Sequence, residues 1–309
     1  MKDIYFLVAP VRSGSTFLRL MLNSHPGITN PGECDFLFDL VSDNGDFPEA
    51  THYKNWLATN RIFNAKSLEI NSEASSSKLI ESFVDQMQTE NSCLIMNVHR
   101  HFHRIPHVFP QAKYIHLLRD PRDVARSAIG MGWVGHVYFG TDIWLEAETS
   151  WERLKSGLND DQYIEIKYEE ILEDVEKGLT RICDFLDLEY TDKMLDYINH
   201  STYKLPDKAL SYQWKRKYSK RELQLVEGKL ESWIEARDYE LSQFEPVVPS
   251  LLEKIRLMVT HKIYRMQFQV QRYGLRLFLE RLVSSRIGSP RWQASCKKRI
   301  STIDLEYLR

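Results

Sequence analysis

Short apolar segments that alternate with helical stretches restrict the fold of this chain more than any other feature. Residues 4–9 (Ile-Tyr-Phe-Leu-Val-Ala) are apolar throughout and rich in β-forming residues, which is typical of a strand buried on both faces of a parallel sheet. Similar segments follow at 93–98, 113–118 and 163–167. Helices are predicted between them, at 76–90, 122–129, 142–157 and 169–187. This alternation predicts an α/β fold around a mostly parallel sheet.

The charge of the chain is unevenly divided along its length. The formal net charge of the 309 residues is −2. Residues 1–245 carry 28 Lys and Arg against 39 Asp and Glu, a net charge of −11, whereas residues 246–309 carry 13 against 4, a net charge of +9. We therefore expect an acidic domain over 1–245 and a basic, amphipathic helical extension over 246–309.

The basic extension needs a partner of its own. A basic amphipathic helix can lie on an anionic membrane or pack against an acidic protein surface. Because residues 1–245 are acidic, we favour packing on this domain or on a second copy, as a homodimer, over a membrane. We expect no nucleic-acid partner.

The cysteines and the N-terminus indicate the compartment. The four cysteines are too scattered for a disulfide framework or a zinc ribbon. The apolar run at 4–11 is too short for a signal peptide or a membrane span. We expect a reduced, cytoplasmic protein.

A loop of phosphate-binding composition joins the first predicted strand to a helix. Backbone N–H groups at a helix N-terminus favour an anion, and residues 12–16 (Arg-Ser-Gly-Ser-Thr) stand at this position. A P-loop for nucleoside triphosphates reads G-x-x-x-x-G-K-[ST]. Here Ala9 replaces the first Gly, Ser15 replaces the Lys, and the cation lies inside the loop as Arg12. A plain tight turn between strand and helix remains the alternative.

A second candidate anion site follows the strand predicted at 113–118. Arg119 leaves the end of this strand, and Ser127 lies two turns into the next helix. Both can face the crevice at the carboxyl ends of the strands, where open α/β sheets bind ligands. The alternatives are a salt bridge from Arg119 to Asp120 or Asp123, and a solvated position for Ser127.

Together these segments resemble the sulfotransferase family, which uses 3′-phosphoadenosine-5′-phosphosulfate (PAPS). Residues 12–18 (Arg-Ser-Gly-Ser-Thr-Phe-Leu) and 22–26 look like its 5′-phosphosulfate loop and helix, in the style of tyrosylprotein and bacterial members. Residues 118–127 look like its 3′-phosphate motif, and residues 164–172 are similar to a later strand and Tyr-Glu-Asp-Leu segment. The resemblance covers 1–245. It implies a P-loop-like three-layer fold with a central parallel sheet of about five strands.

The resemblance also implies roles for individual residues. Arg12 would contact the phosphosulfate and act in catalysis, and no metal is required. Lys215 stands in a late basic segment that resembles the one closing over the donor. The remaining donor-binding candidates are Ser13, Gly14, Ser15, Thr16 and Phe17 for the 5′ side, Arg119 and Ser127 for the 3′-phosphate, and Tyr168 for the adenine.

Two residues compete for the role of general base. Glu33 stands in a Gly-Glu context after the first helix, as the base does in tyrosylprotein-type and several bacterial members. His99 stands after the strand predicted at 93–98, where phenol-type members carry a base His, although their Lys-Thr is Asn-Val here. We favour Glu33 and keep His99 as the alternative.

A metal site near His99 is a third possibility. His101, His103 and His107 follow His99 closely, but zinc sites usually add Cys or a carboxylate in a defined geometry. The sequence offers no such partner, so we expect no metal.

The acceptor site would be built from residues 34–66, 128–141 and 200–220. These segments combine aromatic and acidic side chains, which suits a cationic or polyhydroxylated small molecule, although the aromatic residues could equally form the core. The glycine-rich segment 128–141 has the composition of a mobile loop over a site. The members of this set are Phe36, Phe38, Tyr53, Trp56, Trp133, Tyr138, Phe139, Tyr203, Tyr212 and Trp214, with Asp35, Asp39, Asp43, Asp46 and Glu49.

The leading interpretation is a PAPS-dependent sulfotransferase that acts on a hydroxyl or amine of a small molecule, such as a natural product. The product of the donor would be 3′-phosphoadenosine-5′-phosphate (PAP). A P-loop kinase is the second interpretation, disfavoured by Ala9 and Ser15. A non-catalytic nucleotide-binding protein is the third.

Overall fold

The structure, a computed structural model, describes residues 4–89 and 93–307. The chain divides into two compact units. The first contains the chain up to Val124 together with Asp142–Lys217, and the second contains Ala125–Thr141 and the chain from Tyr218 on. The boundary expected at residue 245 stays a prediction.

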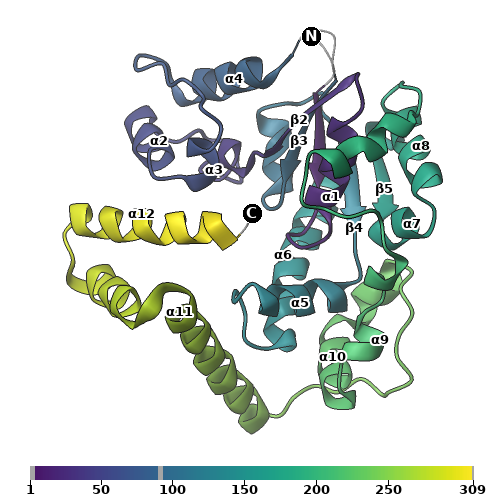
Figure 1. Ribbon diagram of the computed structural model, residues 1–309, viewed down its shortest axis with the longest axis vertical. Coiled ribbons are helices and arrows are strands. Elements are labelled where there is room, and N and C mark those ends of the chain that lie inside the picture. Colours follow the sequence, from purple (N-terminus) through teal and green to yellow (C-terminus); the bar gives the residue numbers. More distant parts are fainter. Residues whose placement is uncertain (1–3, 90–92, 308–309) are drawn as a thin grey trace. The chain divides into compact units, whose positions relative to one another are not determined.

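A five-stranded parallel sheet lies at the centre of the first unit (Figure 1). The strand order is β2-β3-β1-β4-β5, and every neighbouring pair is parallel. This confirms the predicted α/β fold with about five parallel strands. The strands are β1 (Ile4–Val8), β2 (Ile28–Glu33), β3 (Cys93–Val98), β4 (Lys113–Leu118) and β5 (Tyr163–Lys167).

Strand β2 is the one that the sequence analysis did not predict. It contains Pro31 and Gly32, two residue types that are depleted in strands. Proline is tolerated here because β2 lies at the edge of the sheet. The register with β3 shifts between Thr29 and Gly32.

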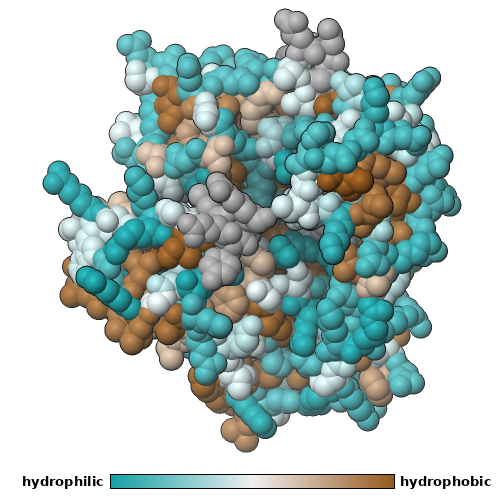
Figure 2. Space-filling model, viewed as in Figure 1, coloured by the Kyte–Doolittle hydropathy of each residue, from teal (hydrophilic) through white to brown (hydrophobic). Residues whose placement is uncertain are grey.

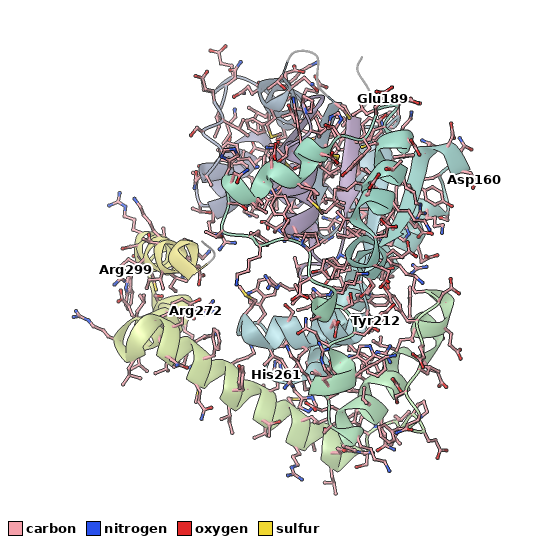
Figure 3. All side chains as sticks on the ribbon, turned by 45° about the vertical axis from the view of Figure 1, so that its right-hand side comes forward. Asp160, Glu189, Tyr212, His261, Arg272 and Arg299 are labelled. Atoms are coloured by element: carbon pink, nitrogen blue, oxygen red, sulfur yellow. The ribbon has the colours of Figure 1, made fainter. Side chains whose placement is uncertain are left out.

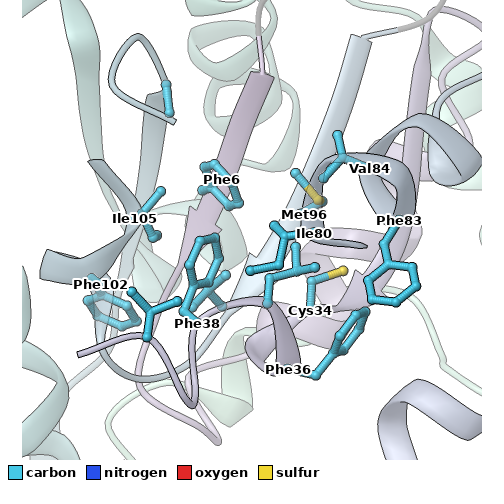
Figure 4. Packing of buried hydrophobic residues seen from close by; sticks show 14 of the residues in the cluster. Phe6, Cys34, Phe36, Phe38, Ile80, Phe83, Val84, Met96, Phe102 and Ile105 are labelled. Carbon is cyan, nitrogen blue, oxygen red and sulfur yellow. The ribbon is translucent and has the colours of Figure 1, made fainter. Parts of the chain in front are cut away.

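The two faces of the sheet are covered by different helices, because successive side chains of each strand point to opposite faces. Phe6 and Val8 of β1 join the core under α2, α3, α4 and α6, part of which is seen in Figure 4. Tyr5 and Leu7 join the core under α1, α7 and α8. These helices are α1 (Ser15–Asn23), α2 (Ala50–Leu57), α3 (Arg61–Asn64), α4 (Ser76–Met87), α6 (Val137–Lys155), α7 (Tyr168–Glu173) and α8 (Val175–Phe185).

The helix expected at 169–187 is two helices. Asp174 has an extended backbone (φ −146°, ψ 95°), and its carboxylate accepts the backbone N–H of Lys177 at 3.0 Å. Asp174 therefore ends α7 and caps α8. Shorter elements complete the first unit: 3-10 helices at Asp35–Leu37, Phe102–His107, Asp160–Gln162, Asp192–Asn199 and Lys208–Leu210, and the helix α9 (Trp214–Lys217).

The second unit consists largely of helices α10 (Lys220–Ala236), α11 (Leu251–Ile287) and α12 (Pro290–Tyr307). Gly274, at φ 76°, interrupts α11. Helix α11 exposes many apolar residues, among them Ile255, Val259 and Ile263, and Figure 2 shows hydrophobic residues at the surface of the molecule. None of the helices in the described part of the chain is long and apolar enough to cross a membrane. Packing of this extension on a second copy stays a prediction, as does a cytoplasmic location.

The segment 128–141 is not the long mobile loop that its composition suggested. Helix α5 (Pro121–Gly130) continues through its beginning and α6 starts at Val137. The remaining connection packs on α11. The N–H of Gly135 donates to Nδ1 of His261 at 3.1 Å, and the hydroxyl of Tyr264 donates to the carbonyl of Ile129 at 3.3 Å (His261 is labelled in Figure 3).

A buried histidine joins β4 to α6 and β5 inside the first unit. His116 is fully buried, with Nε2 3.1 Å from Glu148 and Nδ1 3.2 Å from Glu165. Its ring stacks on Trp151 at 4.2 Å between centroids. Burial lowers the pKa of His116, but the two carboxylates outweigh it and raise the pKa above the usual 6.5.

This arrangement predicts a loss of stability at alkaline pH. Because the folded-state pKa of His116 is raised, its stabilising contribution is complete below pH 6.5 and disappears as the pH rises through the raised pKa. Each unit of the pKa difference is worth about 1.4 kcal/mol. Thermal unfolding from pH 6 to about pH 9 should show a steeper fall in wild type than in His116→Gln. The exposed control His52→Gln should follow wild type, and parallel curves for all three proteins would contradict the assignment.

Candidate active site

The loop between β1 and α1 has a backbone that brings N–H groups together. Arg12 (φ 73°) and Gly14 (φ 92°) are both left-handed, and Gly14 is the N-cap of α1. Left-handed residues within such turns form concave anion-binding nests. A Cβ at Gly14 would lie 2.4 Å from Cε2 of Tyr168, so the close approach of the Tyr168 ring requires glycine here.

Side chains of this loop suit an anion. Ser13 is fully buried, and its hydroxyl has no hydrogen-bond partner among the residues that the structure describes. Buried polar atoms are nearly always hydrogen-bonded, so an anion at this helix start would complete the site. Ser15 is buried and Thr16 is partly exposed beside it. Burial lowers the pKa of the Arg12 guanidinium, and the nearby Arg119 lowers it further.

Arg119 connects the loop with two other segments. Its guanidinium donates to the carbonyl of Arg12 at 3.1 Å and to the carbonyl of Leu210 at 3.2 Å. It also lies over the ring of Tyr168, with Cζ 4.4 Å from the centroid. Its Nε is buried and has no hydrogen-bond partner within residues 4–89 and 93–307. An unsatisfied buried guanidinium N–H is a second feature that fits a bound anion.

The carboxylates nearest to Arg119 in the chain are already engaged. Asp120 pairs with Arg122 at 2.7 Å. Asp123 accepts the backbone N–H groups of Gln213 and Trp214 at 3.0 and 2.8 Å, and its distance to Nη2 of Arg119 is 3.9 Å. The alternative of a salt bridge for Arg119 is thus confirmed for Asp123, at a long 3.9 Å from the carboxylate oxygen that also accepts the N–H of Gln213, whereas Asp120 is paired with Arg122.

Three other predicted donor-binding residues, Lys215, Phe17 and Ser127, lie on different helices. Lys215 lies in the first unit on α9, with Nζ 5.5 Å from the ring of Tyr212, which is labelled in Figure 3. Phe17 is buried edge-on against Tyr168 and Tyr197, so it supports the loop through packing. Ser127 lies on α5 in the second unit, and its role at the 3′-phosphate stays a prediction.

The two candidates for the base lie together. Oε1 of Glu33 is 3.8 Å from Nε2 of His99, and the Glu33 side chain is 44% exposed against 5% for His99. The parallel pairing of β2 with β3 places Glu33 beside Asn97, which brings the two side chains to one edge of the sheet. Glu33 and His99 are alternative candidates for the base in the sequence, and in the structure their side chains lie next to each other.

Hydrogen bonds orient the ring of His99. Nδ1 lies 3.0 Å from the carbonyl oxygen of Ala9, and the backbone N–H of His99 donates to Asp35 at 2.8 Å. Since a carbonyl oxygen only accepts, Nδ1 carries the hydrogen. In the neutral ring, Nε2 therefore presents a lone pair toward Glu33. Sequence reasoning missed the part played by Ala9, because a backbone carbonyl leaves no signal in the residue type. Asp35, expected at the acceptor, instead accepts the backbone N–H of His99.

The histidines that follow His99 are bonded to protein groups. His103 contacts Ser150 at 2.8 Å and Asp43 at 2.9 Å, and His107 contacts the carbonyl of Asp43 at 3.2 Å. Within residues 4–89 and 93–307, no group of three or more His, Cys, Asp or Glu side chains has the arrangement of a metal site.

Several aromatic and acidic residues that were candidates for the acceptor site have other positions in the structure, and for the aromatic ones the alternative of a core position is confirmed. Phe36, Phe38 and Tyr53 are buried in the core beneath the sheet. Asp39 is engaged in two hydrogen bonds from Arg100. These residues therefore stabilise the fold, and the sequence alone could not separate a core aromatic from an acceptor wall.

The comparison with known families decides the identity. Residues 5–192 match the family described as the sulfotransferase family. The chain belongs to the sulfotransferase family. This confirms the resemblance found in the two anion-binding segments.

Solved structures of sulfotransferases share the fold. The sulfotransferase domain of the Synechococcus PCC 7002 olefin synthase has a TM-score of 0.60 and 23% identity, covering 78% of this chain and 98% of that one. The sulfotransferase domain from the curacin biosynthetic pathway has a TM-score of 0.57 and 17% identity, covering 78% and 99%.

A curated relative resembles most of the chain. It is an uncharacterized protein of Aquifex aeolicus (strain VF5), 25% identical over 293 residues, 87% of this chain. The chain spans about a third of that relative, 35% of its length.

Gly14 provides a test of the loop geometry. Gly14→Ala places a Cβ against the Tyr168 ring at a left-handed position, so the free energy of unfolding should fall by about 1–3 kcal/mol. Gly157→Ala is the matched control, because its nearest neighbour would be 3.7 Å away, and it should change stability by less than about 0.5 kcal/mol. Urea unfolding measures both. Equal stability of the two variants would show that the loop tolerates a side chain here.

Proposed function

We propose that the protein transfers a sulfuryl group from PAPS to a hydroxyl or amine of a small-molecule acceptor. The observation that carries this proposal is the pair of buried, unpartnered donors, the Ser13 hydroxyl and Nε of Arg119. They belong to two segments that resemble the 5′- and 3′-phosphate motifs of the family to which the chain belongs. A nucleotide with phosphates at both positions would satisfy both.

The roles of the donor-binding residues follow from their positions. The loop N–H groups with Ser13, Ser15 and Thr16 would hold the 5′-phosphate at the start of α1. Arg119, with Ser127, would hold the 3′-phosphate. PAPS would supply the sulfuryl group, and Arg12 would stabilise negative charge on that group as it moves. The remaining donor contacts in this proposal are Tyr168 at the adenine and Lys215 from α9.

Glu33 and His99 would act together as the base. Nε2 of His99 would take the proton of the acceptor O–H or N–H as that atom attacks the sulfur. The bond between the sulfur and the bridging phosphate oxygen breaks at the same time, and its electrons leave on PAP. Glu33, at 3.8 Å, would stabilise the imidazolium that forms. The buried ring of His99, held by Ala9, needs no reorientation for this step.

The geometry favours this function over the two alternatives. A kinase needs a cation where the P-loop lysine stands, and Ser15 occupies that position. A non-catalytic nucleotide-binding protein has no use for an oriented histidine beside a carboxylate.

We propose that the acceptor is a molecule of natural-product metabolism. The two structurally similar domains come from an olefin synthase and from the curacin biosynthetic pathway. Their identity to this chain is too low to carry an acceptor over, so the proposal names only a small molecule with a free hydroxyl or amine.

The Glu33–His99 pair predicts non-additive losses. Glu33→Gln and His99→Asn should each lower kcat by ~10²-fold or more. Because the two residues act as a unit, kcat of the double variant should be only slightly lower than kcat of the less active single variant. PAP affinity, measured by calorimetry, should stay within about two-fold of wild type.

Exposed residues of the same types provide the controls. Glu81→Gln and His52→Asn should retain wild-type turnover. Losses that multiply in the double variant would show that Glu33 and His99 act independently. Wild-type turnover in Glu33→Gln would leave His99 as the base without a partner.

A further inference from the structure

We infer that the acceptor carries an anionic group, a carboxylate or a phosphate, that binds Arg19 and Lys66 beside Glu33. The inference rests on the proposed function, because it concerns the acceptor end of the same site. It replaces the cationic acceptor that the aromatic and acidic composition of residues 34–66 suggested.

Two cations lie against the backbone that leads into Glu33. The guanidinium of Arg19, on α1, covers Gly32. A Cβ built on Gly32 would lie 3.5 Å from Nη1 and 3.7 Å from Nε of Arg19. Nζ of Lys66, which follows α3, donates to the carbonyl of Pro31 at 2.5 Å. These side chains come from different elements and contact consecutive residues of β2, just before Glu33.

Neither cation has a carboxylate partner in the described part of the chain. Arg19 is partly exposed and forms no hydrogen bond or ion pair there, and Lys66 bonds only to the Pro31 carbonyl. By contrast, Arg100, which follows His99, is paired with both oxygens of Asp39 at 2.6 and 2.7 Å. Arg19 and Lys66 are therefore the cations of this edge that remain available to a ligand.

A purely structural role explains these positions less well. Covering a glycine and bonding a carbonyl can stabilise the turn at 31–33, but an uncharged side chain could do the same. Residues 1–245 hold 39 acidic side chains against 28 basic ones, so cations without an acidic partner are unexpected. A planar guanidinium with unused donors is suited to a carboxylate or a phosphate.

The sheet order separates these cations from the proposed 3′-phosphate site. Arg119 follows β4, and Glu33 ends β2 on the other side of β1. At about 4.8 Å per strand, β2 and β4 lie roughly 14 Å apart. Arg19 and Lys66 therefore lie away from Arg119, against the residues of β2 that precede the proposed base Glu33.

Matched acceptor pairs test the inference. Hydroxyphenylacetate and hydroxydecanoate are each offered as the free carboxylate and as the methyl ester, with PAPS, and acceptor-dependent PAP release is measured. We expect kcat/KM to be at least about ten-fold higher for the carboxylate of a pair. Arg19→Gln and Lys66→Gln should each remove this preference through KM, with kcat nearly unchanged.

Controls separate this result from other effects. Lys54→Gln, whose Nζ bonds to the carbonyl of Ser72, should keep the preference. PAP affinity should be the same in all variants, because a loss of PAP binding would place the two cations at the donor instead. Three results would overturn the inference. The methyl esters could have the same kcat/KM as the carboxylates, or the preference for the carboxylates could survive both substitutions. The third result is that neither carboxylate is turned over. The sulfotransferase assignment itself fails only if wild type neither binds PAP nor releases it from PAPS.

Discussion

The guanidinium of Arg119 is the contact on which the arrangement of the site depends. It holds the carbonyl of Arg12 and the carbonyl of Leu210, and it lies over the ring of Tyr168. That ring in turn occupies the space above Gly14. One side chain thus fixes the loop after β1, the end of β5 and the late segment before α9, while its Nε stays unsatisfied and buried. This is an unstable state for a polar group unless an anion completes it.

The sheet could be predicted from the sequence where its strands are continuously apolar. β3, β4 and β5 have the predicted bounds, because apolar and β-forming residues dominate each of them. β2 was not predicted, because Pro31 and Gly32 are residue types typical of loops. The edge position of β2 permits the proline within a strand. The composition of 128–141 resembled a mobile loop because glycines serve close packing as well as flexibility. A Cβ at Gly135 would lie 2.5 Å from the carbonyl of His261.

The site could be predicted in its motifs but not in its contacts. Arg12 and Arg119 stand out as residue types at strand ends, and the structure brings them together. The Glu33–His99 pair depends on the parallel pairing of β2 with β3, and β2 was not predicted. The cations Arg19 and Lys66 carry no motif. They become visible only once Gly32 and Pro31 are seen beneath them.

Calorimetric titration of the protein with PAP and with AMP, without magnesium, tests the central claim most directly. The two nucleotides share the 5′-phosphate, and only PAP offers a 3′-phosphate to Arg119. The account predicts that PAP binds at least about ten-fold more tightly than AMP, the value of one charge-assisted hydrogen-bonded contact. Equal affinities would contradict it, and so would tight binding of ATP in a parallel titration with magnesium.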